Sequence, residues 1–182
     1  KVGISRMARR AREIFSLPRS EIGSRIQAEP SLALGSVDLS LIELAKGYLS
    51  IASLGEERVP RAVLELKTVS GKILWQAESR ETPERVFSGK TCRTIIPILQ
   101  NVIRTGTASR FIRKKPGFDA AGKSGSSPSD SWFAGFTPET LIVVWAGYDI
   151  PSRAAEGKLP EFTVIPFWYE LIAAENPSRT RF

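Results

Sequence analysis

The stretch AGKSGSS, residues 121–127, combines small residues, one cation and three hydroxyl side chains. Gly125 lets the backbone approach a ligand closely, because no Cβ stands between them. An N–H group that directly follows such a glycine is free to point at a developing oxyanion. Lys123 supplies a positive charge that can hold a carboxylate or bias a nearby proton transfer.

Three serines of the same stretch can each donate a hydrogen bond to a ligand and accept one from it: Ser124, Ser126 and Ser127. Together with Lys123 they suit an acyl-bearing ligand that ends in a carboxylate. The alternative is a solvated Gly/Ser loop with a surface lysine, because short motifs often match by chance. The residues on either side of the stretch favour the first interpretation.

Two apolar segments follow, DSWFAGFTP at residues 130–138 and LIVVWAGY at 141–148, joined by a Thr-Pro-Glu turn. Their pattern predicts a strand that ends in a site, a polar loop and two further strands. In this order the segments resemble the C-terminal half of the transpeptidase domain of class A, bifunctional penicillin-binding proteins. The third motif of that family, Lys-Thr-Gly, is here Lys123-Ser124-Gly125, which keeps the hydroxyl.

Two earlier stretches resemble the same family in the expected order. Residues 31–48, SLALGSVDLSLIELAKGY, resemble its Ala-Leu-Gly segment with the helix that follows, and residues 100–108, QNVIRTGTA, resemble its helix end and Gly-Thr loop. The resemblance covers most of residues 31–174 and is most specific over 122–149.

The resemblance implies an α/β (α+β) fold shared with serine β-lactamases: a mostly antiparallel sheet of about five strands, with helices packed on both faces. The family's Ser-x-x-Lys and Ser-x-Asn motifs are absent, because no lysine has a serine three positions earlier and no asparagine follows a serine by two. We therefore expect residues 1–182 to be the C-terminal part of the domain. The nucleophile and any transglycosylase domain would lie upstream, and the chain alone would be catalytically inert.

The resemblance also implies the roles of the motif. An upstream serine would attack the D-Ala-D-Ala carbonyl of a peptidoglycan stem peptide and form an acyl-enzyme. Lys123 would supply positive charge, the hydroxyls of Ser124 and Ser126 would bind the substrate carboxylate, and the Ser126 N–H would be one oxyanion donor. Gly125 would let the substrate bind by strand addition, and Ser127 is a weaker candidate ligand. β-Lactams would stop the reaction at the acyl stage, and no metal or organic cofactor is implied.

Composition limits the chemistry. The 182 residues contain no histidine, which excludes a Ser-His-Asp triad, and a single cysteine, Cys92, which excludes an intramolecular disulfide. A zinc site is implausible for the same reasons, and apolar neighbours predict that Cys92 is a small buried side chain. No run of 18 apolar residues occurs.

The remaining patterns predict the other elements. We expect an amphipathic basic helix over residues 1–15, a polar connector over 16–30, and a helix over 39–54 with Asp38 or Ser40 as N-cap. A hairpin of strands 61–67 and 73–75 would lie at the edge of the sheet, a helix would span 92–104 with Pro97 in its first two turns, and a last helix would span 161–174.

Two other functions fit parts of the sequence. A serine β-lactamase or β-lactam sensor would share the fold and the Lys-Ser-Gly motif. The net charge of +7 would also fit a basic, non-catalytic module that binds nucleic acid or an anionic wall polymer. We favour the transpeptidase and expect no nucleic-acid partner. The expected partners are stem peptides, β-lactams and the upstream part of the same protein. The expected location is the periplasm or the outer face of the bacterial cytoplasmic membrane, with any membrane anchor outside this chain.

Overall fold

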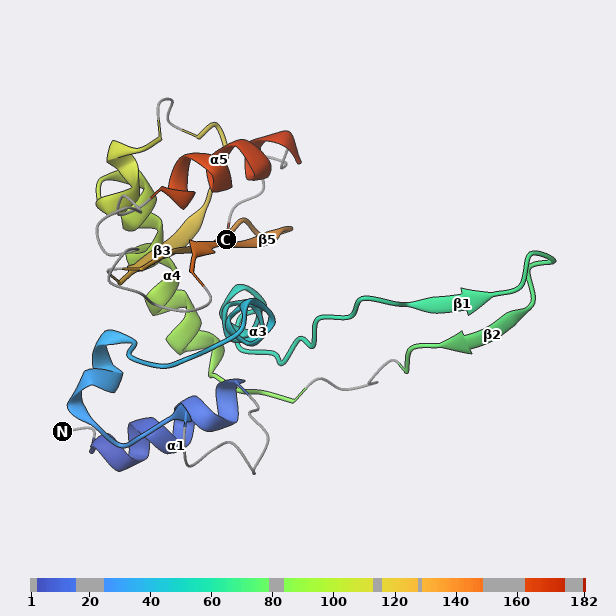
Figure 1. Ribbon diagram of the computed structural model, residues 1–182, viewed down its shortest axis with the longest axis horizontal. Helices are drawn as coiled ribbons and strands as arrows, with labels where there is room; N and C mark the ends of the chain where they lie inside the picture. Colours follow the sequence, from blue (N-terminus) through green and yellow to red (C-terminus); the bar gives the residue numbers. More distant parts are fainter. Residues whose placement is uncertain are drawn as a thin grey trace.

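A computed structural model describes residues 3–15, 25–78, 84–112, 116–127, 129–148, 163–175 and 182. Figure 1 shows the elements, which follow one another as α1 (Ile4–Phe15), η1 (Pro30–Leu34), α3 (Leu41–Ala52), β1 (Glu65–Lys67), β2 (Ile73–Gln76), α4 (Gly89–Arg104), η2 (Thr107–Arg110), β3 (Ala121–Ser126), β4 (Asp130–Phe136), β5 (Leu141–Gly147) and α5 (Val164–Ala174). Among the described residues, no helix is long and apolar enough to cross a bilayer.

The central sheet is antiparallel, with strand order β3-β4-β5. Ala121 of β3 pairs with Phe136 of β4, and Phe136 pairs with Leu141 of β5. The predicted Thr-Pro-Glu turn joins β4 to β5, and the Thr137 hydroxyl accepts hydrogen bonds from the N–H groups of Glu139 and Thr140 at 3.2 and 3.0 Å. No further described strand pairs with β3, which therefore lies at an edge of the sheet.

Helix α5 covers one face of the sheet (Figure 1). Trp168 is fully buried there, with its ring centroid 4.7 Å from that of Phe133. The Trp168 indole N–H donates to the Gly135 C=O at 3.2 Å, so the one polar atom of this side chain is satisfied inside the core.

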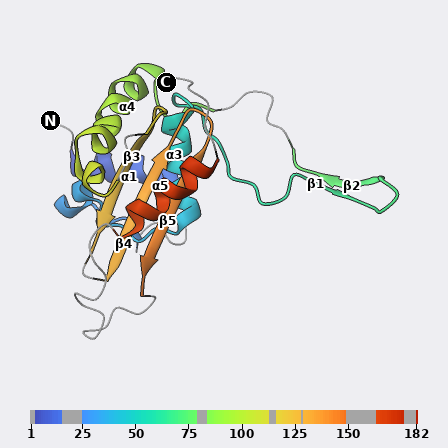
Figure 2. The same ribbon diagram turned by 90° about the horizontal axis from the view of Figure 1, so that it is seen from above.

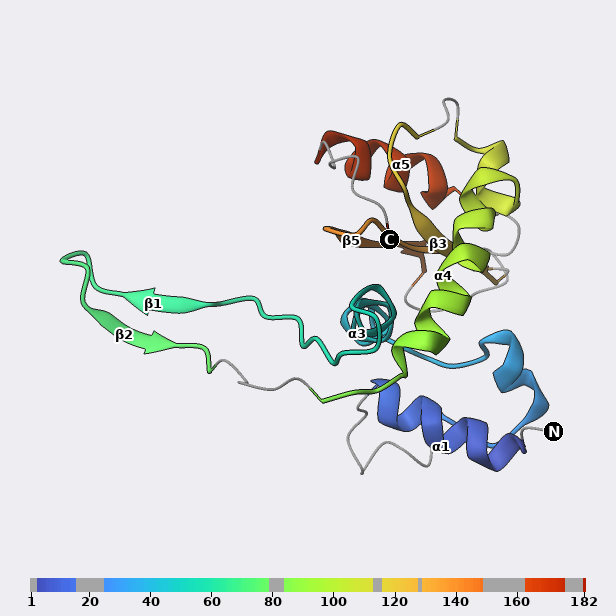
Figure 3. The same cartoon turned by 180° about the vertical axis from the view of Figure 1, so that it is seen from behind.

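Helices α3 and α4 cover the opposite face, as the view from behind also shows (Figure 3). Phe136 packs there against Tyr48 of α3, with ring centroids 6.3 Å apart, and against Cys92 and Ile96 of α4. Burial raises the pKa of Tyr48 to about 12 and also raises the pKa of the Cys92 thiol. The predictions of helices on both faces and of a buried Cys92 are confirmed.

A third cluster joins α1 to the segment around η1. Ala8, Ile26 and Leu32 form its buried centre. The Arg12 guanidinium donates to the Ile26 C=O at 2.6 Å and holds the two segments together. The predicted basic helix is confirmed, with bounds Ile4–Phe15.

The helix caps decide between alternatives that the sequence left open. Ser40, and not Asp38, caps α3: its hydroxyl accepts from the Glu43 N–H, and the Glu43 carboxylate accepts from the Ser40 N–H. Helix α4 begins at Gly89, where the Ser88 hydroxyl accepts from the Thr91 N–H at 3.1 Å. The prediction for Pro97 is therefore wrong, because the earlier start places this residue in the third turn.

The prediction that the hairpin lies at the edge of the central sheet is also wrong. Strands β1 and β2 form a separate two-stranded sheet, so the five strands lie in two sheets. The hairpin extends away from the body of the molecule (Figure 2), and all seven of its strand residues are exposed. The hairpin itself is confirmed, with Gly71 in its turn at φ +86°. The sequence pattern of residues 61–75 therefore predicts that β1 and β2 pair with each other, but not where the hairpin lies relative to the central sheet.

Candidate active site

The Lys-Ser-Gly motif lies in β3 along the open edge of the sheet. Beyond the end of β3, Ser127 and Asp130 exchange backbone hydrogen bonds of 3.0 and 3.4 Å, which fixes the hydrogen-bonding register with β4. Successive peptide groups of a strand point to opposite sides. Gly122, Ser124 and Ser126 therefore turn their N–H and C=O groups away from β4, toward the open edge.

The Lys123 side chain is exposed and bends toward this edge. Its Nζ donates to the C=O of Ser124 at 2.6 Å. A positive charge therefore lies beside the unpaired backbone groups of β3, where a bound carboxylate would meet it.

Ser124 is buried on the opposite face of the strand, with 7% of its surface exposed. Its Oγ lies 3.2 Å from the Oγ1 of Thr107, the first residue of η2. Thr107 is held in place by the end of α4, where the Gly106 N–H donates to the Asn101 C=O at 2.7 Å. A pair of hydroxyls thus joins η2 to the motif.

Sequence reasoning did not select Thr107 as a site residue. The signal was present, because residues 100–108 carried part of the family resemblance. The sequence of that stretch indicates the order of the motifs, but its contact with β3 depends on the three-dimensional fold.

Gly125 and Ser126 leave space at the edge. A Cβ added at Gly125 would meet its nearest atom, the Cβ of Trp132, at an ordinary 3.5 Å. At Gly122, in contrast, a Cβ would lie 2.8 Å from the Phe133 ring, which is too close. Packing within the chain therefore explains the glycine at 122 but not the one at 125. Ser126 is exposed, and its N–H points to the open edge.

The Ser127 hydroxyl takes part in the turn between β3 and β4. It donates to Asp130 Oδ2 at 2.8 Å and accepts from the Ser129 N–H at 3.2 Å. The other carboxylate oxygen, Asp130 Oδ1, accepts from the Trp145 indole N–H at 2.8 Å. Ser127 therefore stabilises the shape of the site, and direct contact between Ser127 and a substrate stays a prediction.

Comparison with known proteins identifies the family of the chain. A family model described as "Penicillin binding protein transpeptidase domain" matches residues 12–159. The chain belongs to the penicillin-binding protein transpeptidase family. This result confirms the family that the Lys-Ser-Gly motif and its following strands indicated.

Relatives in the family are penicillin-binding proteins 1A and 1B. The chain is 30% identical over 144 residues to penicillin-binding protein 1A of Aquifex aeolicus, covering 77% of this chain and 19% of that protein. It is 31% identical over 122 residues to penicillin-binding protein 1B of Escherichia coli, covering 66% of this chain and 14% of that protein. The chain thus spans less than one fifth of the length of these two relatives.

Solved structures of penicillin-binding proteins share the fold. Penicillin-binding protein 1A from Haemophilus influenzae matches with a TM-score of 0.83 and 20% identity, over 99% of this chain and 32% of that chain. PonA1 from Mycobacterium tuberculosis matches with a TM-score of 0.73 and 21% identity, over 96% and 50%. The α+β transpeptidase fold expected from the sequence is therefore confirmed.

Proposed function

We propose that the chain supplies the Lys-Ser-Gly wall of a serine D,D-transpeptidase that cross-links peptidoglycan. The observation that carries the proposal is the open edge of β3, where the Lys123 Nζ and the Ser126 N–H and hydroxyl are available together. Family membership supports the proposal. The nucleophilic serine and the Ser-x-Asn residues are assigned to the part of the domain that precedes residues 1–182.

In this proposal the stem peptide binds as an additional strand along β3. Its terminal carboxylate lies near the Lys123 ammonium and accepts hydrogen bonds from the Ser124 and Ser126 hydroxyls. Either hydroxyl can be the donor in the 3.2 Å contact between Thr107 and Ser124. In this proposal Thr107 is the donor, which would leave the Ser124 proton free for the carboxylate. Because Gly125 has no Cβ, the backbone of the stem peptide can approach the backbone of β3 closely at this position.

The chemistry is acyl transfer. The upstream serine attacks the carbonyl carbon between the two D-alanines, and the Ser126 N–H stabilises the negative charge that develops on oxygen. The C–N bond then breaks, and the terminal D-alanine leaves with a proton on its amine. The amine of a second stem peptide attacks the acyl ester, forms the cross-link and releases the serine. A β-lactam follows the first half of this path and stays attached.

The proposed setting follows from the substrate. Peptidoglycan lies outside the bacterial cytoplasmic membrane, so we place the protein in the periplasm or on the outer face of that membrane. PonA1 of Mycobacterium tuberculosis has been solved in complex with penicillin V. A β-lactam is therefore the natural probe for this chain within its full-length protein, and the upstream part of the same protein is its main partner.

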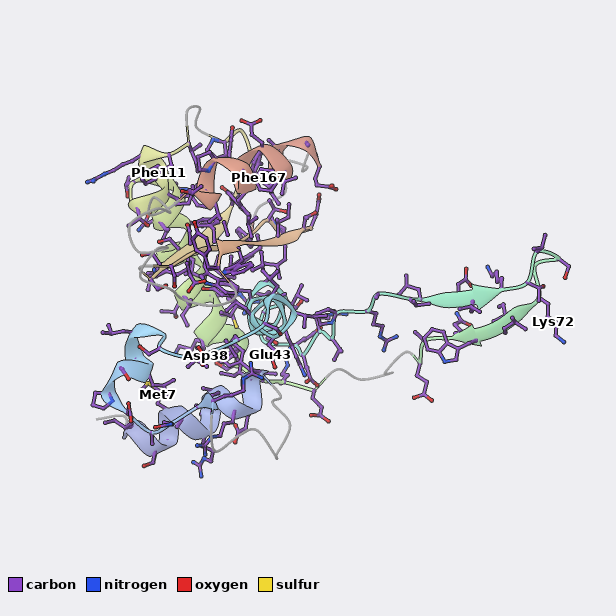
Figure 4. All side chains as sticks on the ribbon, in the orientation of Figure 1. Met7, Asp38, Glu43, Lys72, Phe111 and Phe167 are labelled. Atoms are coloured by element: carbon purple, nitrogen blue, oxygen red, sulfur yellow. The ribbon has the colours of Figure 1, made fainter. Side chains whose placement is uncertain are left out.

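The experiment is acylation of the full-length protein by a penicillin, followed by intact mass and peptide mapping. We expect one covalent adduct on a serine upstream of residue 1. Lys123→Ala should slow acylation by about two orders of magnitude, the scale of losing one positioned electrostatic group. Lys72→Ala is the matched control, because Lys72 lies at the tip of the hairpin, away from β3 (Figure 4), and should leave the rate unchanged.

The same experiment separates the alternatives. An adduct that persists supports the transpeptidase, whereas rapid hydrolysis of the adduct would identify a β-lactamase. Complete lack of acylation would contradict the proposal and favour a non-catalytic module.

A further inference from the structure

Among the residues that the structure describes, no layer packs against the hairpin β1–β2. It forms a sheet of its own, and no third strand joins it within the described ranges. Its large apolar side chains stand in water, with Leu64, Leu66 and Trp75 exposed to 67%, 50% and 50%. A lone two-stranded hairpin is marginally stable in water, and further strands or a packed face stabilise it. The hairpin is therefore suited to gain strands from a partner.

The backbone hydrogen bonds show which groups of β1 remain free. The Ala77 N–H donates to the Leu64 C=O at 2.8 Å, and the Thr68 N–H donates to the Lys72 C=O at 2.8 Å. Positions 64, 66 and 68 thus face β2. Because peptide groups alternate in direction, Glu65 and Lys67 turn their N–H and C=O groups outward. The outer edge of β1 offers two donors and two acceptors.

This edge is complementary to itself. When two β1 strands align antiparallel about a two-fold axis through Leu66, Glu65 lies opposite Lys67 of the second copy, and Lys67 lies opposite its Glu65. Both are hydrogen-bonded pairs, so four backbone bonds form and two pairs of opposite charges face each other. Within one copy the two side chains already share a face, with Nζ and Oε1 2.6 Å apart.

The apolar side chains agree with the same alignment. Leu66 pairs with Trp75 and lies on the face opposite to Glu65 and Lys67. At the two-fold axis, Leu66 would meet Leu66 of the second copy, and one face of the combined sheet would be apolar. The outer edge of β2 offers no such match, because alignment about Trp75 would place Leu74 opposite Gln76.

We propose that the hairpin joins two copies of this chain, with the β1 edges paired in one four-stranded antiparallel sheet. The proposal is independent of the transpeptidase assignment, since it uses no residue of β3. Because the strands are short, the association is a reversible monomer–dimer equilibrium and not a permanent complex.

Charge reversal in the full-length protein tests the pairing by sedimentation velocity over a concentration series. Glu65→Lys places lysine opposite lysine in both pairs, and Lys67→Glu places glutamate opposite glutamate. Each variant should weaken dimerisation by about tenfold or more. An equimolar mixture of the two should restore the dimer, because every cross-strand pair is again of opposite charge. The double variant Glu65→Lys/Lys67→Glu should dimerise like the unchanged chain, which shows that the hairpin still forms.

Lys72→Glu is the control, because it makes the same charge change in the turn, outside β1, and should leave the equilibrium unchanged. The proposal is overturned if the unchanged full-length protein stays monomeric at the highest concentration reached. It is also overturned if the dimer persists in both single variants, or if their mixture stays monomeric. In the first case another polypeptide would be the partner of the edge, and in the second case another surface would join the copies.

Discussion

Glu43 takes part both in the capping box of α3 and in an ion pair with Arg25. Its Oε2 accepts from the Ser40 N–H at 2.7 Å and from the Ser40 hydroxyl at 2.9 Å. The Arg25 guanidinium binds both carboxylate oxygens, at 3.0 and 2.7 Å. This hydrogen bonding from Arg25 is the main reason that the pKa of Glu43 falls from 4.5 to about 2.

The pKa of Glu43 makes stability depend on pH. Because the folded value lies below the unfolded one, the stabilisation is complete above about pH 4.5 and is lost as pH falls toward 2. Glu43→Gln should therefore lower the free energy of unfolding by about 1–3 kcal/mol at pH 7 and by almost nothing near pH 2. Urea unfolding at both pH values measures the difference. Glu13→Gln removes an exposed ion pair and should cost less than about 1 kcal/mol at either pH.

Gly135 is required by packing. A Cβ at this position would overlap the Trp168 ring and crowd Phe133. Gly135→Ala should cost about 1–3 kcal/mol or more, because the core between β4 and α5 must shift. Gly117→Ala is the control, since nothing lies within 4 Å of a Cβ there. Equal thermal stability of the two variants would contradict this account of the core.

At the scale of elements, the contact between η2 and β3 has a chemical consequence. If Thr107 orients the Ser124 hydroxyl, then Thr107→Val should slow penicillin acylation of the full-length protein by about tenfold, the scale of one hydrogen bond. Thr107→Ser keeps the hydroxyl and should recover most of the rate. The rate of acylation is measured for both variants. An unchanged rate in Thr107→Val would show that Thr107 does not orient the Ser124 hydroxyl for the reaction.

Most elements could be predicted from the sequence, because periodicity and turn residues are local signals. The strands after the motif, helix α3 and the closing helix all follow from residues near one another in the chain. The start of α4 at Gly89 was not predicted because its N-cap, Ser88, lies in a polar stretch. The location of the hairpin and the partner of Ser124 were missed because both depend on residues far apart in sequence.

At the scale of the whole molecule, burial is uneven. In the described part of the chain, two clusters fill the two faces of the sheet and a third joins α1 to the segment around η1. No cluster of described residues includes the hairpin. We therefore expect the free energy of local unfolding to differ between the central sheet, the region around α1 and the hairpin. Amide hydrogen exchange of the monomer should be slowest in β4, because β4 is hydrogen-bonded to β3 on one side and to β5 on the other. Of the five strands, β1 and β2 should exchange fastest.

Exchange rates followed by mass spectrometry test this gradient. A single shared rate for β4 and the hairpin would mean that the molecule opens as one unit, in contradiction to the separate clusters. The hairpin exposes large apolar side chains, so we also expect the isolated chain to be marginally stable or prone to aggregation. A sharp monomeric thermal transition would count against it.

The four tryptophans lie in different surroundings, so their intrinsic fluorescence can report on different parts of the chain. Trp168 is fully buried, Trp132 and Trp145 lie with ring centroids 5.9 Å apart near the motif, and Trp75 is 50% exposed on the hairpin. Light emitted by Trp75 comes from an indole in contact with water, which iodide ions can quench. Events at the hairpin can therefore be followed by fluorescence without any added dye, separately from events at the core.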